Sequence, residues 1–399
     1  MDDLSFLWRR CRVIFLITCL SNAGCGSGES TKEGGGQIVP PLVLNPIGPG
    51  HFEAATFIKT IPVADVIAAL PKEAIGLIKP LYSVDTYKIT YSTTDANGRA
   101  IVASGLTAIP RKSPNLSSPV LSYQHATVKK DSGAPTNHAT ADEPAILFAS
   151  VGYLASAADY VGYGATRGLP HPYLLAGPTA ASVADFIVAS ARWRKMQMIA
   201  DNGQLFLTGY SEGAYATIAT QRLLTQNAST TSQLSTSTFV GAGPYDVAIT
   251  LNSYLDIIRQ QNPILGVLIN PGLLKNLGAN DRNNLRNLFL FAVLGSQSDV
   301  SFDSTFLDNF LNDDVVAIAA QNSVVDWTPI SPISFFHGHD DTTVSYANTD
   351  AIFRTMSNRG AGALIDRLDC PVKPSEHIPC VSSFLVNDIA RLGAVAKGL

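Results

Sequence analysis

One serine in the sequence has the surroundings of a nucleophile. The string Gly209-Tyr210-Ser211-Glu212-Gly213 follows an apolar stretch at 205–208 and precedes a run at 214–226 with helical composition. A strand, a tight turn and a helix in this order form a nucleophile elbow, which exposes the serine at the helix N-terminus. Developing negative charge is favoured there. We therefore predict that Ser211 attacks acyl groups; the alternative is a serine that caps a helix after a glycine turn.

A serine nucleophile needs a base and a group that orients the base. In an elbow architecture the acid and then the histidine follow the serine along the chain. Three histidines come after Ser211, namely His337, His339 and His377. The first two lie in the string that follows a predicted strand at 333–336. If the acid lies in that string, His377 is the base by elimination; the alternative is a surface histidine.

Two neighbouring aspartates compete for the role of the acid. The string His337-Gly338-His339-Asp340-Asp341-Thr342-Thr343-Val344 has the form His-Gly-x-x-Asp-x-x-Val. Its fifth position falls at the turn after the strand, which favours Asp341 over Asp340. Asp326 is a third candidate that precedes the strand. The chosen carboxylate would accept the Nδ1–H of His377 and stabilise the imidazolium.

The same string also has the His-x-His-x-Asp spacing of a metallo-β-lactamase-type metal site. Such a site would need a histidine at the position of Thr342 and further histidines downstream, where only His377 remains. We therefore expect no metal ligands here, and the predicted mechanism requires no metal or organic cofactor.

The oxyanion of an acyl-transfer intermediate needs two backbone donors. One is the N–H of Glu212, the residue after the nucleophile, and the other comes from a loop after an early strand, at 123–127. The Glu212 side chain is an alternative catalytic carboxylate, but the elbow geometry predicts that it points away from the serine.

The five cysteines fall into two groups. Three lie among the first 25 residues, and the remaining two are Cys370 and Cys380. In an oxidising compartment this pair predicts a disulfide. Two buried thiols are the alternative, and a zinc site lacks a second cysteine pair. The disulfide would enclose His377 and hold its imidazole toward Ser211.

The N-terminus has the pattern of an export signal. Three arginines within residues 9–12 precede an apolar run at 13–20, which is too short to span a membrane. We interpret residues 1–25 as a signal peptide and 26–50 as a linker. Small residues before Cys25 make it a lipidation candidate, so we expect either an envelope lipoprotein anchored to the membrane through Cys25 or a secreted protein.

The rest of the chain predicts one α/β domain at 51–399. Of the 399 residues of the whole chain, 15% are charged. The net charge is −4, and lysine and arginine are not clustered, which argues against a nucleic-acid partner.

Along the predicted domain, strands alternate with helices, which favours a mainly parallel sheet with helices on both faces. About 247–327 has helical patterns without a convincing strand, which is typical of a cap. The predicted strands lie at 84–91, 100–109, 120–123, 152–158, 205–208, 239–242, 333–336 and 363–368, and the predicted main helices at 179–198, 214–226 and 381–396.

Several short strings occur in an order that resembles a known family. They are Tyr123-Gln124-His125-Ala126-Thr127, Asp159-Tyr160-Val161-Gly162-Tyr163-Gly164, His171-Pro172-Tyr173, the string around Ser211, His337-Gly338-x-x-Asp341 and His377. Over about 80–395 they resemble secretory lipases of the lipase A type and their bacterial relatives, within the α/β-hydrolase superfamily.

The resemblance implies the α/β-hydrolase fold with a helical cap, and small-molecule or lipid esters as substrates. It implies Ser211, Asp341 and His377 as the catalytic triad, and the backbone N–H groups of His125 and Glu212 as the oxyanion hole. Relatives often have glycine where this chain has Ala126.

The predicted function is therefore a serine esterase or lipase that works through an acyl-enzyme. A serine peptidase and a polyester or polysaccharide-ester hydrolase are rivals on the same fold. A non-catalytic envelope lipoprotein that keeps the fold as a scaffold is a rival of another class, and its signature would be a broken triad.

Overall fold

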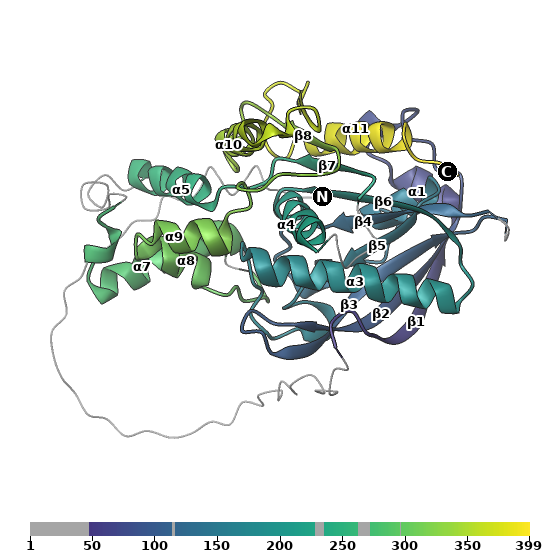
Figure 1. The fold of residues 1–399 in the computed structure, drawn as a ribbon, viewed down its shortest axis with the longest axis horizontal. Coiled ribbons are helices and arrows are strands. Elements are labelled where there is room, and N and C mark those ends of the chain that lie inside the picture. Colours follow the sequence, from purple (N-terminus) through teal and green to yellow (C-terminus); the bar gives the residue numbers. More distant parts are fainter. Residues whose placement is uncertain (1–47, 114–115, 228–234, 262–271, 296) are drawn as a thin grey trace, which may run out of the picture. The chain divides into compact units, whose positions relative to one another are not determined.

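A computed structural model describes the chain from residue 48 onward (Figure 1), within the unit Pro40–Leu399. The predicted signal peptide, most of the predicted linker and Cys25 lie outside the described residues. The described ranges are 48–113, 116–227, 235–261, 272–295 and 297–399.

Nine strands form a single mixed sheet with the order β1-β2-β3-β5-β4-β6-β7-β8-β9. The pairs from β1 to β5 are antiparallel, and those from β5 through β4 to β9 are parallel. The strands are β1 (Phe52–Ile61), β2 (Val84–Thr94), β3 (Ala100–Pro110), β4 (Ser118–Gln124), β5 (Leu154–Ala158), β6 (Asp201–Tyr210), β7 (Ser237–Gly241), β8 (Ile333–His337) and β9 (Ile365–Asp369). The sheet is mainly parallel, as predicted, and all the predicted strands are present.

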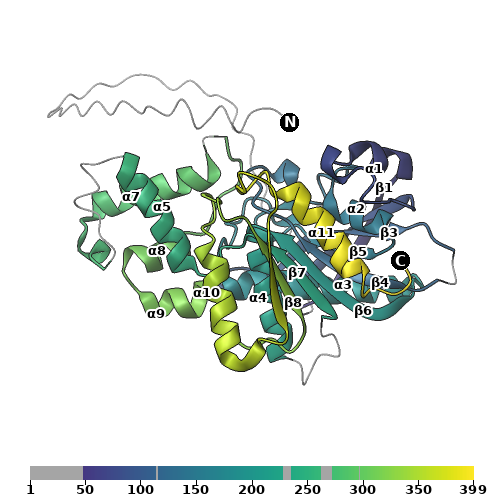
Figure 2. The same ribbon diagram turned by 90° about the horizontal axis from the view of Figure 1, so that it is seen from above.

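Helices cover both faces of the sheet (Figure 2). The helices that flank it are α1 (Val63–Ala69), α2 (Pro144–Ser150), α3 (Ala176–Met196), α4 (Glu212–Gln226), α10 (Ala347–Met356) and α11 (Val381–Gly393). Apolar side chains of α1, α2 and α11 share one core, and those of α3 and α4 share another. Every residue of β4 and β5 is buried, because strands covered on both faces have no solvent side.

Helix α3 begins three residues before the predicted start at Thr179 and includes Gly177 and Pro178. Proline is tolerated in the first turn, because the N–H that it lacks has no partner within the helix. A glycine-proline pair is therefore compatible with a helix start and does not mark its outer limit.

The segment between β7 and β8 is helical, as the sequence predicts. Its described helices are α5 (Val247–Gln261), α7 (Ala279–Leu294), α8 (Thr305–Leu311) and α9 (Val315–Ala317). None of the named strands lies in the described part of this segment. We call it the cap insertion; it follows the carboxyl end of β7, and its helices group together beside the sheet (Figure 1). Within the described ranges, no helix combines the length and apolarity that crossing a bilayer requires.

Candidate active site

Ser211 lies between the end of β6 and the start of α4, in a backbone conformation that few residues adopt. Its φ is 59° and its ψ is −124°. Such a conformation costs about 1–3 kcal/mol and persists only where the surroundings enforce it. Here the Ser211 N–H donates to the carbonyl oxygen of Gly241, at 2.8 Å, so the neighbouring strand β7 holds the turn.

Gly209 and Gly213 are required by close backbone contacts on either side of the serine. A Cβ on Gly209 would lie 2.4 Å from the carbonyl group of Gly213, and a Cβ on Gly213 would lie 2.0 Å from the carbonyl oxygen of Gln124. The two glycines therefore let α4 start against the end of β4. This packing brings the loop after β4 beside the elbow.

Three side chains from separate loops form one hydrogen-bonded row. His377 Nε2 is 2.9 Å from Ser211 Oγ, and His377 Nδ1 is 2.6 Å from Asp341 Oδ2. The loops follow β6, β8 and β9, whose carboxyl ends meet at one edge because these strands are parallel. Asp341 and His377 are buried. The structure thus brings together the three residues that the sequence singles out.

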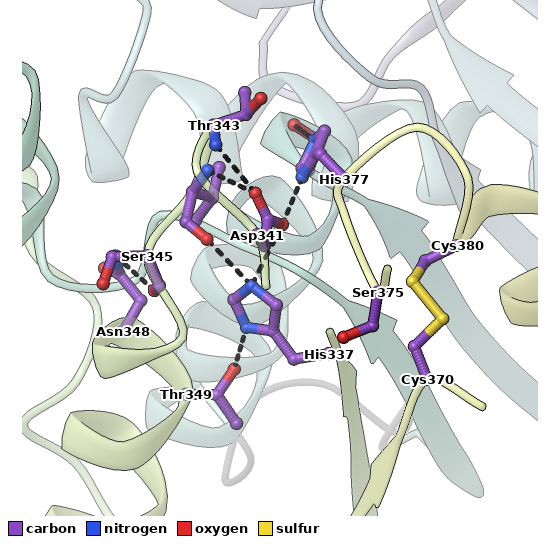
Figure 3. Close-up of polar contacts among 12 residues, drawn as sticks. His337, Asp341, Thr343, Ser345, Asn348, Thr349, Cys370, Ser375, His377 and Cys380 are labelled. Atoms are coloured by element: carbon purple, nitrogen blue, oxygen red, sulfur yellow. Dashed lines mark hydrogen bonds and ion pairs between the residues drawn. A yellow bond between two sulfur atoms is a disulfide. The ribbon is translucent and has the colours of Figure 1, made fainter. Parts of the chain in front are cut away.

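Asp341 accepts hydrogen bonds at both carboxylate oxygens (Figure 3). Besides His377, Oδ2 contacts His337 Nε2 at 3.2 Å, while Oδ1 accepts the N–H groups of Thr343 and Val344 at 2.9 and 2.8 Å. Burial alone would raise the pKa of Asp341, but the hydrogen bonds from His337 and His377 outweigh it and lower the pKa to about 2. The carboxylate is therefore ionised at neutral pH and able to balance an imidazolium.

Asp340, the alternative acid, does not contact the imidazole. Its Oδ2 accepts the N–H and the hydroxyl of Ser375, both at 2.8 Å, on the loop that carries His377. Asp326, the third candidate, forms an ion pair with Arg359. Within the described residues, Asp341 alone of these three aspartates contacts His377.

The two histidines of the His-x-His-x-Asp string point in different directions. His337 is buried, and its Nδ1 accepts the hydroxyl of Thr349 at 2.7 Å (Figure 3). His339 is exposed, stacks on Tyr346 and contacts Asp369. The described residues contain no group of three or more side chains arranged to hold a metal ion. His337 thus supports Asp341 at 3.2 Å, a contact that the string containing both residues does not predict.

The loop around His377 is fixed at several points. Cys370 and Cys380 form the predicted disulfide (Figure 3). The hydroxyl of Tyr210, the residue before the nucleophile, donates to the carbonyl oxygen of His377 at 2.7 Å. Ser375 can approach Gly338 closely because glycine has no side chain: a Cβ on Gly338 would lie 1.9 Å from the carbonyl oxygen of Ser375. The imidazole is therefore held from the elbow side and from the β8 side.

The proposed oxyanion donors lie in neighbouring segments. Glu212 is the first residue of α4, and the N–H groups of a first helical turn have no acceptor within the helix. His125 directly follows β4, and burial lowers the pKa of its ring. That ring stacks on Tyr160 with 4.0 Å between centroids, and its Nδ1 is 2.8 Å from the carbonyl oxygen of Ala126. The ring is thus engaged with the protein, and any donor role of His125 belongs to its backbone.

Comparisons with known proteins bear on the fold. No family model matches the chain, and no curated protein matches its sequence. Among solved structures, the cell wall degrading esterase LipA of Xanthomonas oryzae is similar, with a TM-score of 0.67 and 20% identity over 88% of this chain and 100% of that one. Candida antarctica lipase A in its closed state has a TM-score of 0.55 and 18% identity, over 83% of this chain and 78% of that one. The chain has the α/β-hydrolase fold.

Proposed function

We propose that this protein is a serine hydrolase of carboxylic esters, with Ser211, His377 and Asp341 as its catalytic triad. The observation that carries the proposal is the row from Ser211 Oγ through the His377 ring to Asp341, with contacts of 2.9 and 2.6 Å. The fold is consistent with it, and the two similar structures named above are of an esterase and a lipase.

In the proposed reaction, Ser211 Oγ attacks the ester carbonyl carbon while His377 Nε2 takes the hydroxyl proton. The carbonyl oxygen becomes an oxyanion, which the N–H groups of Glu212 and His125 would stabilise. The imidazolium then gives its proton to the departing alcohol, and the acyl group stays on Ser211. A water molecule, deprotonated by the same imidazole, then attacks the acyl carbon; the imidazolium returns this proton to Ser211 Oγ as the acid is released.

Asp341 has a separate task in both steps. Its ionised carboxylate accepts Nδ1–H, which leaves Nε2 free of hydrogen and ready to accept a proton. The same charge stabilises the transient imidazolium. A scaffold protein would have no need for this complete row, so the geometry favours an enzyme.

The direct test is the substitution Ser211→Ala, assayed on p-nitrophenyl esters. We expect kcat to fall by at least about 10⁴-fold, because the attacking oxygen is removed, while the thermal unfolding midpoint changes little. A fluorophosphonate probe should label the wild-type protein at Ser211 and leave the variant unlabelled. Unchanged turnover in the variant would refute the proposal.

A series of p-nitrophenyl esters from acetate to palmitate would separate a short-chain esterase from a lipase. The cap insertion packs on the rest of the domain through an apolar core that includes Tyr173, Phe302 and Phe306, so the series tests the acyl chain length that the protein accepts. Peptide amide and polyester substrates belong in the same assay, because cleavage of these alone would favour a peptidase or a depolymerase.

A further inference from the structure

A buried pair of titratable side chains lies directly behind the elbow. His171 Nε2 is 2.6 Å from Glu212 Oε1, and the side chains are 1% and 3% exposed. His171 belongs to the loop before α3, and Glu212 is the residue whose backbone N–H is a proposed oxyanion donor. This contact takes the Glu212 carboxylate away from Ser211 toward a partner 41 residues earlier in the chain.

The hydrogen bonds of His171 fix the number of protons in the pair. Its Nδ1 is 2.8 Å from the carbonyl oxygen of Val161, which can only accept, so Nδ1 carries a hydrogen. A single proton then lies between Nε2 and Glu212 Oε1. Whether it resides on nitrogen or on oxygen, the pair as a whole has no net charge.

Glu212 depends on this partner for its neutrality. Its second oxygen, Oε2, is buried and has no hydrogen-bond partner among the described residues. A carboxylate in such a place is costly when its counter-charge is removed. Without His171, the Glu212 carboxyl group must either take up a proton of its own or leave a bare negative charge on the residue whose N–H must receive a developing oxyanion.

The loop that carries the second proposed oxyanion donor, the N–H of His125, packs against the same pair through Tyr160. The ring of Tyr160 stacks between His125 and His171, with centroid distances of 4.0 and 5.8 Å, and its hydroxyl donates to the carbonyl oxygen of His125 at 3.1 Å. The rings of His125, Tyr160 and His171 therefore connect the loop after β4 to the Glu212 side chain.

The backbone of His171 is fixed from the cap side. Its N–H donates to the carbonyl oxygen of Ser301 at 2.8 Å, and its carbonyl accepts the N–H of Asp303 at 2.7 Å. The ring of His171 is thus anchored by Val161 and its backbone by the cap insertion, so it offers Glu212 a rigid partner.

We propose that His171 is a positioning residue for the oxyanion hole, which keeps its pair with the Glu212 side chain free of net charge and the Glu212 N–H directed at the developing oxyanion. This inference rests on the proposed ester hydrolysis. An interaction that matters only when the oxyanion forms should affect kcat and leave KM nearly unchanged.

The test is a charge-rescue experiment at the pair. In His171→Gln the glutamine cannot supply the shared proton, so at an assay pH high enough to ionise its carboxyl group Glu212 becomes a buried anion, and at lower pH it must bind a proton of its own. We expect kcat for a p-nitrophenyl ester to fall about 10- to 100-fold with KM within about threefold. The double variant His171→Gln/Glu212→Gln is neutral again and should recover at least about tenfold in kcat over the single variant. A merely structural role predicts that the double variant is no better than the single one.

A matched control is Asp388→Asn on α11, which alters another fully buried carboxyl group, hydrogen-bonded to Thr208. Within the described residues Asp388 forms no hydrogen bond with His171 or His125, so the kcat of this variant should stay within about threefold of wild type. Should His171→Gln not fold, Glu212→Asp replaces it: the charge remains but the shorter side chain leaves His171, and kcat should fall in the same range with KM unchanged.

The outcomes separate this inference from the proposed function. Ester turnover that depends on Ser211, together with a His171→Gln or Glu212→Asp kcat equal to wild type, would overturn the inference alone. A double variant no faster than His171→Gln would do the same. Absence of turnover that depends on Ser211 in the wild-type protein would overturn the proposed function and this inference together.

Discussion

Adjacent aspartates at the turn after β8 contact different partners. The Asp341 carboxylate accepts hydrogen bonds from the His377 ring and from two backbone N–H groups, whereas the Asp340 carboxylate accepts them from Ser375. The side chains of these consecutive residues diverge, so one of them is the proposed catalytic acid and the other anchors the loop that carries His377.

We predict unequal losses of activity from the two conservative substitutions at this turn. Asp341→Asn should lower kcat by roughly 10³- to 10⁴-fold, because an amide can hold His377 in the wrong tautomer and cannot balance an imidazolium. Asp340→Asn should lower kcat by less than about tenfold, since an amide oxygen still accepts from Ser375. Steady-state kinetics on one ester compare them, and an equal loss would contradict the assignment of the acid.

At the residue scale, the sequence predicted a site residue where a local motif, or the order of residue types along the chain, left few candidates. The string around Ser211 carries its own strand, turn and helix signals, and the position of His377 follows from the order of the remaining histidines. The support that His337 and His171 provide was not predictable in this way. Their partners are set by how buried loops pack, and no local pattern states which histidine will meet which carboxyl group.

At the scale of elements, the loop between β9 and α11 carries His377, the proposed base, and is fixed by several contacts. It is closed by the disulfide, tied to Asp340 through Ser375 and tied to the elbow through Tyr210. Tyr210 ends β6, Asp340 follows β8 and Cys370 follows β9. The position of the imidazole therefore does not depend on its own loop alone.

We predict that removing the disulfide weakens both stability and turnover. The double substitution Cys370→Ala/Cys380→Ala opens a loop with a sequence separation of 10 residues and should lower the free energy of unfolding by about 3 kcal/mol on the chain-entropy argument. We expect kcat to fall more than KM rises, because a looser His377 spends less time in line with Ser211. Urea unfolding and ester kinetics measure the two effects; an unchanged kcat would mean that Tyr210 and Asp340 suffice to place the base.

Strands and the long helices were predictable because their burial patterns are visible in the sequence, and β2, β3 and α4 end within a few residues of expectation. The edge strand β1 was missed. Nine of its ten residues from Phe52 to Ile61 are exposed or half-buried, so the sequence shows no apolar alternation that separates an inner from an outer face. Its strand conformation is set by pairing with β2, which is tertiary information. Helix α10 was likewise not predicted.

At the scale of the whole molecule, three buried carboxyl groups, those of Glu143, Asp159 and Asp388, form no ion pair within the described residues. Burial raises the pKa of Glu143 to about 8 and raises those of Asp159 and Asp388. Each group binds its proton more tightly in the folded chain than in the unfolded one. Stability must therefore decline as the pH rises from the unfolded pKa toward the folded one.

Glu143, the N-cap of α2, offers the clearest test of this pH dependence. The pKa of Glu143 is about 4.5 in the unfolded chain, and below this pH its full contribution to the free energy of unfolding is present. The contribution is lost progressively up to about pH 8, at a cost of up to a few kcal/mol. We predict that Glu143→Gln, which cannot ionise, has a shallower fall in thermal unfolding midpoint between pH 5 and pH 9. Parallel curves for the variant and the wild type would show that the Glu143 ionisation does not govern alkaline stability.

The cap insertion leaves the sheet after β7 and returns at β8, and these two strands are direct neighbours. An insertion whose two ends emerge side by side can be lengthened, shortened or exchanged without displacing the strands that position the proposed triad. Substrate range in this architecture can therefore diverge separately from bond-breaking chemistry. A transplanted cap would have to preserve the backbone seam between His171 and residues 301–303, together with the contacts that Asp299 makes with Lys129, Asp131 and Arg167.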